Sequence, residues 1–120
     1  MEQHLITITK QLLDCIEAKD WTTYTKLCSV NITCFEPEAR GHLIEGLPFH
    51  QYYFNLPKSE APSNTSIVNP RVTFLGENSA FVTYVRLIQR GAQTVASEET
   101  RIWKKENGQW KNVHFHRSSL

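Results

Sequence analysis

The second half of the chain alternates apolar and polar residues over long stretches, and this feature constrains the fold most. Alternation with a period of two is typical of half-buried β-strands. A turn signal separates each stretch from the next, and the pair Asn107-Gly108 favours a tight type I′ hairpin. The sequence therefore predicts a four-stranded antiparallel meander. Its strands are expected over residues 65–75, 79–90, 94–105 and 109–118.

The first half predicts helices that precede this sheet. Apolar residues recur at helical spacing from Leu5 to Ile16, which indicates one amphipathic helix within the first twenty residues. Asp20 is a suitable cap for a second, short helix. A short strand is expected over 30–34, and Pro48 is well placed as the first residue of a third, aromatic helix.

Helices followed by a meander predict an α+β fold. In this arrangement a curved antiparallel sheet wraps its apolar face around the N-terminal helices and leaves a cone-shaped cavity. The chain has 120 residues, of which 40% are hydrophobic, and this is enough for one core. We expect a single domain over residues 1–120.

Composition argues against several function classes. Thirteen basic and twelve acidic residues give a net charge of +1 with no long run of either sign, which predicts no nucleic-acid partner. No segment has the roughly 20 apolar residues of a membrane helix, and no signal peptide is recognisable, so we expect a cytoplasmic protein without a membrane partner. The three cysteines, Cys15, Cys28 and Cys34, lack metal-binding spacing and are expected to be free core thiols.

Strand parity places three arginines on apolar faces of the predicted sheet. Side chains two residues apart share a face, so Arg86 lies with Val82 and Tyr84, Arg101 with Trp103, and Arg117 with Val113 and Phe115. A buried charge needs a partner, because leaving water costs several kcal/mol. We therefore expect these arginines to converge in the cavity, where Glu99, which has the parity of Arg101, is a candidate internal partner.

Two interpretations of this arginine cluster stay open. In the first, the arginines are satisfied internally by Glu99, Glu36 or Glu38 and serve only the fold. In the second, they form a pocket for an anion, since the planar guanidinium suits bidentate recognition of carboxylates.

Metal and enzyme chemistry have weaker signals. His114 and His116 share one strand face, but the sequence marks no third ligand, so no metal site and no cofactor are expected. A small-molecule isomerase or dehydratase that uses the cone cavity is the alternative function. The only two aspartates, Asp14 and Asp20, lie in the opening helices, and a glutamate beside arginines would be a weak base, so no catalytic residue is expected.

The long strands are apolar on both faces, which predicts self-association. On the strand 79–90, Phe81, Val85 and Leu87 lie opposite Val82 and Tyr84. One face packs on the helices, and the other is expected to be covered by a second copy of the chain. Scattered surface apolar residues are the alternative explanation.

Several segments together resemble a known family. They are Cys34-Phe35-Glu36-Pro37-Glu38-Ala39, Leu43-Ile44-Glu45-Gly46 with Phe49-His50, Tyr84-Val85-Arg86, residues 97–103 and residues 108–117. In the same order and over nearly the whole chain, they are similar to the association (hub) domain of calcium/calmodulin-dependent protein kinase type II.

This resemblance implies a nuclear transport factor 2-like cone that self-associates into two stacked rings, dodecameric or tetradecameric, without catalysis of its own. It also implies that His50, Arg86, Arg101 and Arg117 line a pocket for a small carboxylate or an acidic peptide segment. The kinase regulatory segment is a further candidate partner. The family usually has an arginine where this chain has Gln51, and the segments before Asn55 and around Gly91 look shorter. The subunit number therefore stays open.

Overall fold

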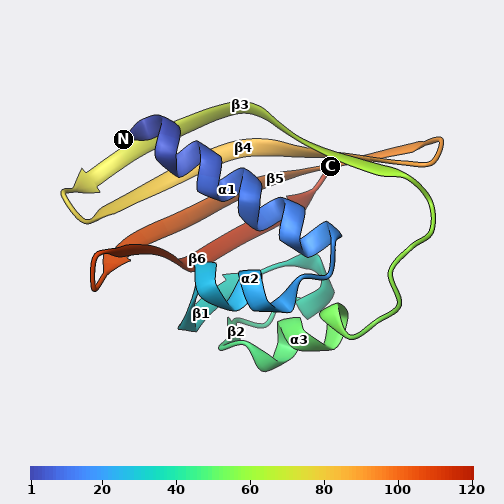
Figure 1. Ribbon diagram of the computed structural model, residues 1–120, viewed down its shortest axis with the longest axis horizontal. Coiled ribbons are helices and arrows are strands. Elements are labelled where there is room, and N and C mark those ends of the chain that lie inside the picture. The colour runs from blue at the N-terminus through green and yellow to red at the C-terminus, as the bar shows by residue number, and fades with distance from the viewer.

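The computed structural model describes residues 1–120 as one six-stranded sheet with helices packed on one of its faces (Figure 1). The helices are α1 (Glu2–Glu17), α2 (Trp21–Leu27) and α3 (Pro48–Phe54), with a short 3₁₀ turn at Pro37–Ala39. The strands are β1 (Cys28–Phe35), β2 (Ile44–Glu45), β3 (Ser63–Gly76), β4 (Ser79–Arg90), β5 (Gln93–Glu106) and β6 (Gln109–Ser119). Their order in the sheet is β2-β1-β6-β5-β4-β3.

The predicted meander is confirmed, since β3 to β6 pair antiparallel and in sequence order. The sheet is larger than predicted, however, because β1 and β2 extend it beside β6. The strand β1 runs parallel to β6, with Cys34 opposite Phe115. The α+β prediction is therefore right, with one parallel pair in an otherwise antiparallel sheet.

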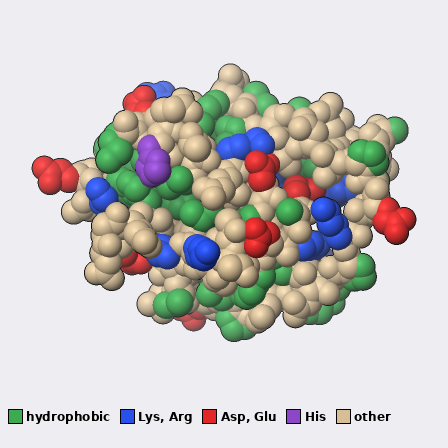
Figure 2. All heavy atoms as spheres, viewed as in Figure 1, with side chains coloured by type: hydrophobic (Ala, Val, Ile, Leu, Met, Phe, Trp, Pro, Cys, Tyr) green, Lys and Arg blue, Asp and Glu red, His purple; other side chains and the backbone are tan.

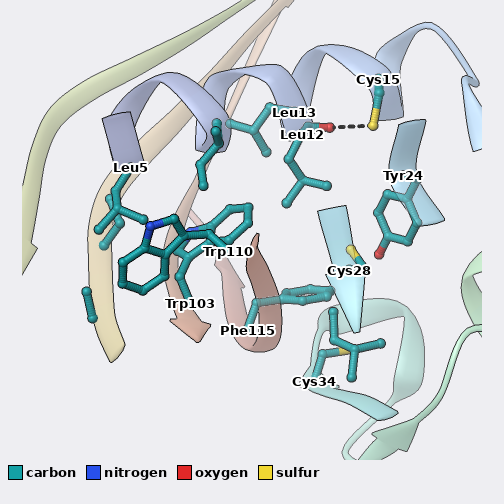
Figure 3. Packing of buried hydrophobic residues seen from close by; sticks show 14 of the residues in the cluster. Leu5, Leu12, Leu13, Cys15, Tyr24, Cys28, Cys34, Trp103, Trp110 and Phe115 are labelled. Atoms are coloured by element: carbon teal, nitrogen blue, oxygen red, sulfur yellow. Dashed lines mark hydrogen bonds between the residues drawn. The ribbon is translucent and has the colours of Figure 1, made fainter. Parts of the chain in front are cut away.

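The core lies between α1 and the inner face of the sheet. Leu5 and Leu12 of α1 are fully buried against Trp103 of β5 and Trp110 of β6, and Figure 3 shows both indoles beneath the helix. Burying a leucine side chain stabilises the fold by about 1.5–3 kcal/mol. The Trp103 indole donates a hydrogen bond of 3.1 Å to Thr9 Oγ1, so its one polar atom is satisfied.

Local capping sets where the helices begin and end. Asp20 caps α2 as predicted, since its Oδ1 accepts a 3.1 Å hydrogen bond from the Thr23 backbone. The first helix ends at Glu17, three residues earlier than expected, and Lys19 then adopts a left-handed φ of 58° that turns the chain into α2. Pro48 occupies the first turn of α3, as predicted.

The three cysteines are buried and free, as predicted. Cys28 and Cys34 lie on β1, and Cys15 faces inward from α1, where its thiol donates to the Leu12 carbonyl (Figure 3). Burial raises the pKa of Cys15 and of Cys28 to about 12, so both thiols are protonated at neutral pH. No helix is long and apolar enough to span a membrane.

Candidate functional site: a cavity of arginines and glutamates

A cavity of about 310 Å³ lies between the sheet and the ends of the helices. Residues from α1, α2 and α3 form one wall, and inward side chains of β4, β5 and β6 form the other. His50, Arg86, Arg101 and Arg117, the four residues that the sequence singled out, all line this one cavity.

The Glu99 carboxylate is the centre of the polar network in the cavity wall. It is 2% exposed and accepts a 2.6 Å hydrogen bond from the Tyr84 hydroxyl. Arg101 contacts it through Nε at 3.2 Å and Nη2 at 3.1 Å, and Arg86 Nη1 donates at 3.3 Å. Burial alone would raise the pKa of Glu99, but Arg101 and then Arg86 lower it, and the resulting pKa is below its ordinary value.

Arg101 is fully satisfied within the protein. Its Nη1 donates a 2.8 Å hydrogen bond to Asn112 Oδ1, and its guanidinium lies 4.2 Å from the centre of the Phe115 ring. Burial alone would lower the pKa of Arg101, but the neighbouring Tyr84 and Glu99 outweigh it and raise the pKa. With 1% exposure, this arginine acts mainly as the structural counter-charge of Glu99.

Arg86 is less completely paired. Apart from its contact with Glu99, its Nη2 lies 3.7 Å from Glu17 Oε1, which is too long for a hydrogen bond. Its Nε is buried and has no hydrogen-bond partner. Glu17 is instead held by Arg90, whose Nη2 lies 2.9 Å from both carboxylate oxygens. Arg86 therefore has hydrogen-bonding capacity left for another acceptor.

Arg117 lies at the side of the cavity next to the 3₁₀ turn. It donates to Glu38, and its Nη2 lies 3.7 Å from Glu36 Oε1. Burial would raise the pKa of Glu38, but its hydrogen bond to Arg117 lowers the pKa below its ordinary value. The predicted alignment of Arg117 with Phe115 is correct, whereas Val113 lies at a shift in the β5–β6 register and is only half-buried.

His50 is 5% exposed and lies on α3 opposite the end of β1. Burial lowers its pKa to about 4, with a further contribution from Arg101, so the imidazole is neutral at pH 7. Its Nε2 lies 3.7 Å from the Cys34 thiol and its Nδ1 lies 3.8 Å from Glu36 Oε2. Burial raises the pKa of Glu36 and of Cys34.

The charges of the site are balanced. The cavity and its wall contain four arginines, which are Arg86, Arg90, Arg101 and Arg117, and four glutamates, which are Glu17, Glu36, Glu38 and Glu99. On the face of the molecule drawn in Figure 2, acidic and basic side chains are likewise interspersed, with no large patch of one sign. An anion that enters the cavity must therefore compete with carboxylates of the protein.

The two aspartates and Glu99 are poor candidates for general acid–base chemistry. Asp14 is exposed and pairs with Lys10, and Asp20 is occupied as a helix cap, so neither lies in the cavity. The lowered pKa of Glu99 makes it a weak base at neutral pH.

Sequence reasoning missed Glu17 and Arg90, because their contact depends on how α1 is placed on the sheet.

A search against protein-family models matches residues 1–120 to the calcium/calmodulin dependent protein kinase II association domain. The chain belongs to this family. It is 47% identical to the calcium/calmodulin-dependent protein kinase type II subunit delta of Oryctolagus cuniculus over 98% of this chain but 23% of that protein. The association domain thus spans about a quarter of that relative's length.

Solved structures agree with this assignment. The association domain of the C. elegans kinase is 46% identical and superposes with a TM-score of 0.90, covering 97% of this chain and 93% of that one. Association domains of this family mediate oligomerisation and are not catalytic on their own. A putative ketosteroid isomerase from Parabacteroides distasonis is 19% identical with a TM-score of 0.75, over 100% of this chain and 88% of that one, and this likeness shows a shared fold alone.

Proposed function

We propose that this association domain assembles into a stacked double ring of twelve or fourteen copies and that its arginine-lined cavity binds an anionic ligand. Ring closure needs one isologous contact that pairs two copies and one heterologous contact that repeats around the ring. The observation that carries the assembly proposal is the composition of the sheet's outer face.

The outer face has a row of apolar residues, interrupted by polar ones, that the chain itself covers poorly. All three helices contribute to the single core on the inner face, so none is left for the outer face. Cross-strand register places Val68 beside Val85 and Phe81 beside Ile102 on this face, and all four side chains are only half-buried. The pair Thr83–Thr100 lies between these apolar pairs, and Glu98 lies opposite Val85 on β5. Apolar residues in register across neighbouring strands favour burial against another sheet of the same kind.

A charged substitution in this row tests the assembly. Val85→Glu is expected to reduce the assembly to small species in sedimentation velocity, because a carboxylate in an apolar contact would be buried without a partner. Gln11→Glu, on the exposed side of α1, adds the same charge elsewhere and is expected to leave the assembly intact. A folded Val85→Glu variant that sediments like the wild type would contradict a contact through this face.

Arg86 supports the second part of the proposal. It lines the cavity and has a buried Nε without a partner, so an acceptor in the cavity would satisfy it. A small carboxylate or an acidic peptide segment has the required chemistry. His50 and Arg117 line the same cavity, whereas Arg101 would contribute through its charge, because its hydrogen bonds are already made.

Calorimetric titration with a short hydroxycarboxylate, 3-hydroxybutyrate, tests this binding. We expect saturable heat at millimolar ligand in the wild type and at least a severalfold loss of affinity in Arg86→Gln. The control is Arg71→Gln, which removes an exposed arginine of β3 outside the cavity. Absence of heat in the wild type, or equal affinity in Arg86→Gln, would refute an anion site here and leave the assembly proposal standing.

A further inference from the structure

Three different metal-binding side chains meet at the side of the cavity where β1 ends and α3 begins. Cys34 and Glu36 are two residues apart and point the same way, and His50 of α3 packs against both. The Cys34 thiol lies 3.5 Å from Glu36 Oε2 and 3.7 Å from His50 Nε2. One donor atom from each residue lies within 4.8 Å of the other two.

The Glu36 carboxylate receives no strong hydrogen bond in this arrangement. Its side chain is 8% exposed, and its one hydrogen bond comes from the Cys34 thiol, a weak donor. Arg117 is 3.7 Å away and is already engaged by Glu38. Burying an ionised carboxylate without strong donors is costly, so the site favours a cation that would take up this charge.

We propose that Cys34, Glu36 and His50 form a binding site for a Zn²⁺ ion in the cavity wall. Zn²⁺ takes thiolate, imidazole and carboxylate ligands, with Zn–S of about 2.3 Å and Zn–N and Zn–O of about 2.0–2.2 Å. Donors around a tetrahedral ion at these distances stand about 3.5 Å apart. The separations of 3.5 and 3.7 Å from the thiol are close to this geometry. The third separation, between one imidazole nitrogen and the Glu36 carboxylate, is bounded at 4.8 Å, and a rotation of the His50 ring would let one nitrogen face both other donors.

The charge and the access of the site also suit a divalent ion. A thiolate and a carboxylate would neutralise Zn²⁺, and the thiol proton would be released on binding. Glu36 and His50 line the cavity, while Cys34 is fully buried behind them. An ion can therefore enter from the cavity, and three protein ligands leave its fourth coordination position facing the open space.

Cobalt substitution provides the direct test on the whole chain. Reduced protein is dialysed against a chelator, freed of it and titrated with Co²⁺, and Zn²⁺ is then added. We expect a thiolate-to-cobalt charge-transfer absorption that saturates at one ion per chain and is abolished by Zn²⁺. Cys34→Ser, Glu36→Gln and His50→Gln are each expected to weaken binding by at least about tenfold.

Matched controls separate this site from other thiols and histidines. Cys28→Ser removes a second buried thiol from β1, and His116→Gln breaks the histidine pair on the outer sheet face, so both should retain the absorption. No charge-transfer band in the wild type, or a band unchanged in Cys34→Ser, would overturn the proposal. If circular dichroism shows that Cys34→Ser does not fold, Glu36→Gln serves as the test, since it keeps the shape of the side chain. Undiminished Co²⁺ binding by folded Glu36→Gln would also overturn the proposed site.

Discussion

The two ends of the space between sheet and helices are built on opposite principles. Under α1, Leu5, Leu12 and Trp103 form an apolar core with 0% exposure, and the hydrogen bond from Trp103 to Thr9 satisfies its buried indole N–H. Toward α3, the same sheet carries Arg86 and Arg117 into a cavity, and Arg86 pairs with the buried Glu99. The first region is stabilised by apolar burial, whereas in the second region charge pairing offsets the cost of desolvation.

This difference separates stabilisation by apolar burial from charge pairing within one domain. Replacing a buried ion pair by apolar residues is often neutral or stabilising, so the charged end is not needed for folding as such. A protein that only had to fold could extend the apolar core across the sheet. The proposed ligand and ion sites would give the balanced charges around this cavity of about 310 Å³ a role other than stability.

The largest expected effect lies in the charged region. Glu99→Gln removes the carboxylate between Arg101 and Arg86, which leaves Arg101 buried without its counter-charge and Arg86 with only the Glu17 contact at 3.7 Å. We expect a loss of about 3–5 kcal/mol in the free energy of unfolding, measured by urea denaturation at fixed protein concentration. The control is Glu77→Gln, which removes a carboxylate from the exposed β3–β4 turn. Equal stability of the two variants would show that the buried arginines do not depend on the Glu99 charge.

The apolar region should respond to loss of volume instead of charge. Leu12→Ala leaves a cavity beneath α1 and is expected to cost about 2–5 kcal/mol in the same assay. Leu12→Met, which nearly conserves volume, is expected to cost less than about 1.5 kcal/mol. If both substitutions cost the same, the packing of this core would not be the source of its stability.

Acid should affect the two regions differently. The pKa of Glu99 is lower in the folded protein, so its contribution is fully present above the ordinary carboxyl pKa of 4.5 and is lost as pH falls through the folded value. Wild type is therefore expected to lose more stability than Glu99→Gln between pH 6 and pH 3, while Leu12→Ala should follow the wild type. Parallel pH profiles of wild type and Glu99→Gln would contradict the lowered pKa.

The smallest expected effect concerns the one side-chain hydrogen bond between α1 and the sheet in the apolar region. Thr9→Val keeps the shape of the side chain and leaves the Trp103 indole N–H without its acceptor at 3.1 Å. We expect a loss of about 1–3 kcal/mol, measured as a lower urea midpoint with an unchanged m-value. An unchanged midpoint would mean that this bond adds no net stability.

The sequence predicted the parts of the fold that depend on local pattern. Strand parity places Arg86 and Arg101 on the inner face, because alternation is a property of a single strand. It fails at Val113, where a shift in the β5–β6 register interrupts the alternation. The parallel pairing of β1 with β6 was not predicted either, since nothing in two strands so far apart in sequence specifies their partner.

The site was predictable in its charges but not in its full membership. Glu17 reaches Arg90 only because α1 crosses the sheet at one particular angle, which no periodicity encodes. Cys34 and Glu36 share a parity that the sequence displays, but His50 joins them only after the 3₁₀ turn and β2 bring α3 back over β1. Long-range packing therefore created both of these groupings, which the sequence did not reveal.

Native mass spectrometry of the wild-type chain tests the central claim most directly. At micromolar concentration, we expect a dominant species of twelve or fourteen times the 13.9 kDa chain mass, with dimers as the main product of gentle dissociation. A spectrum dominated by monomers or isolated dimers under the same conditions would contradict the account of this association domain as a ring-forming scaffold.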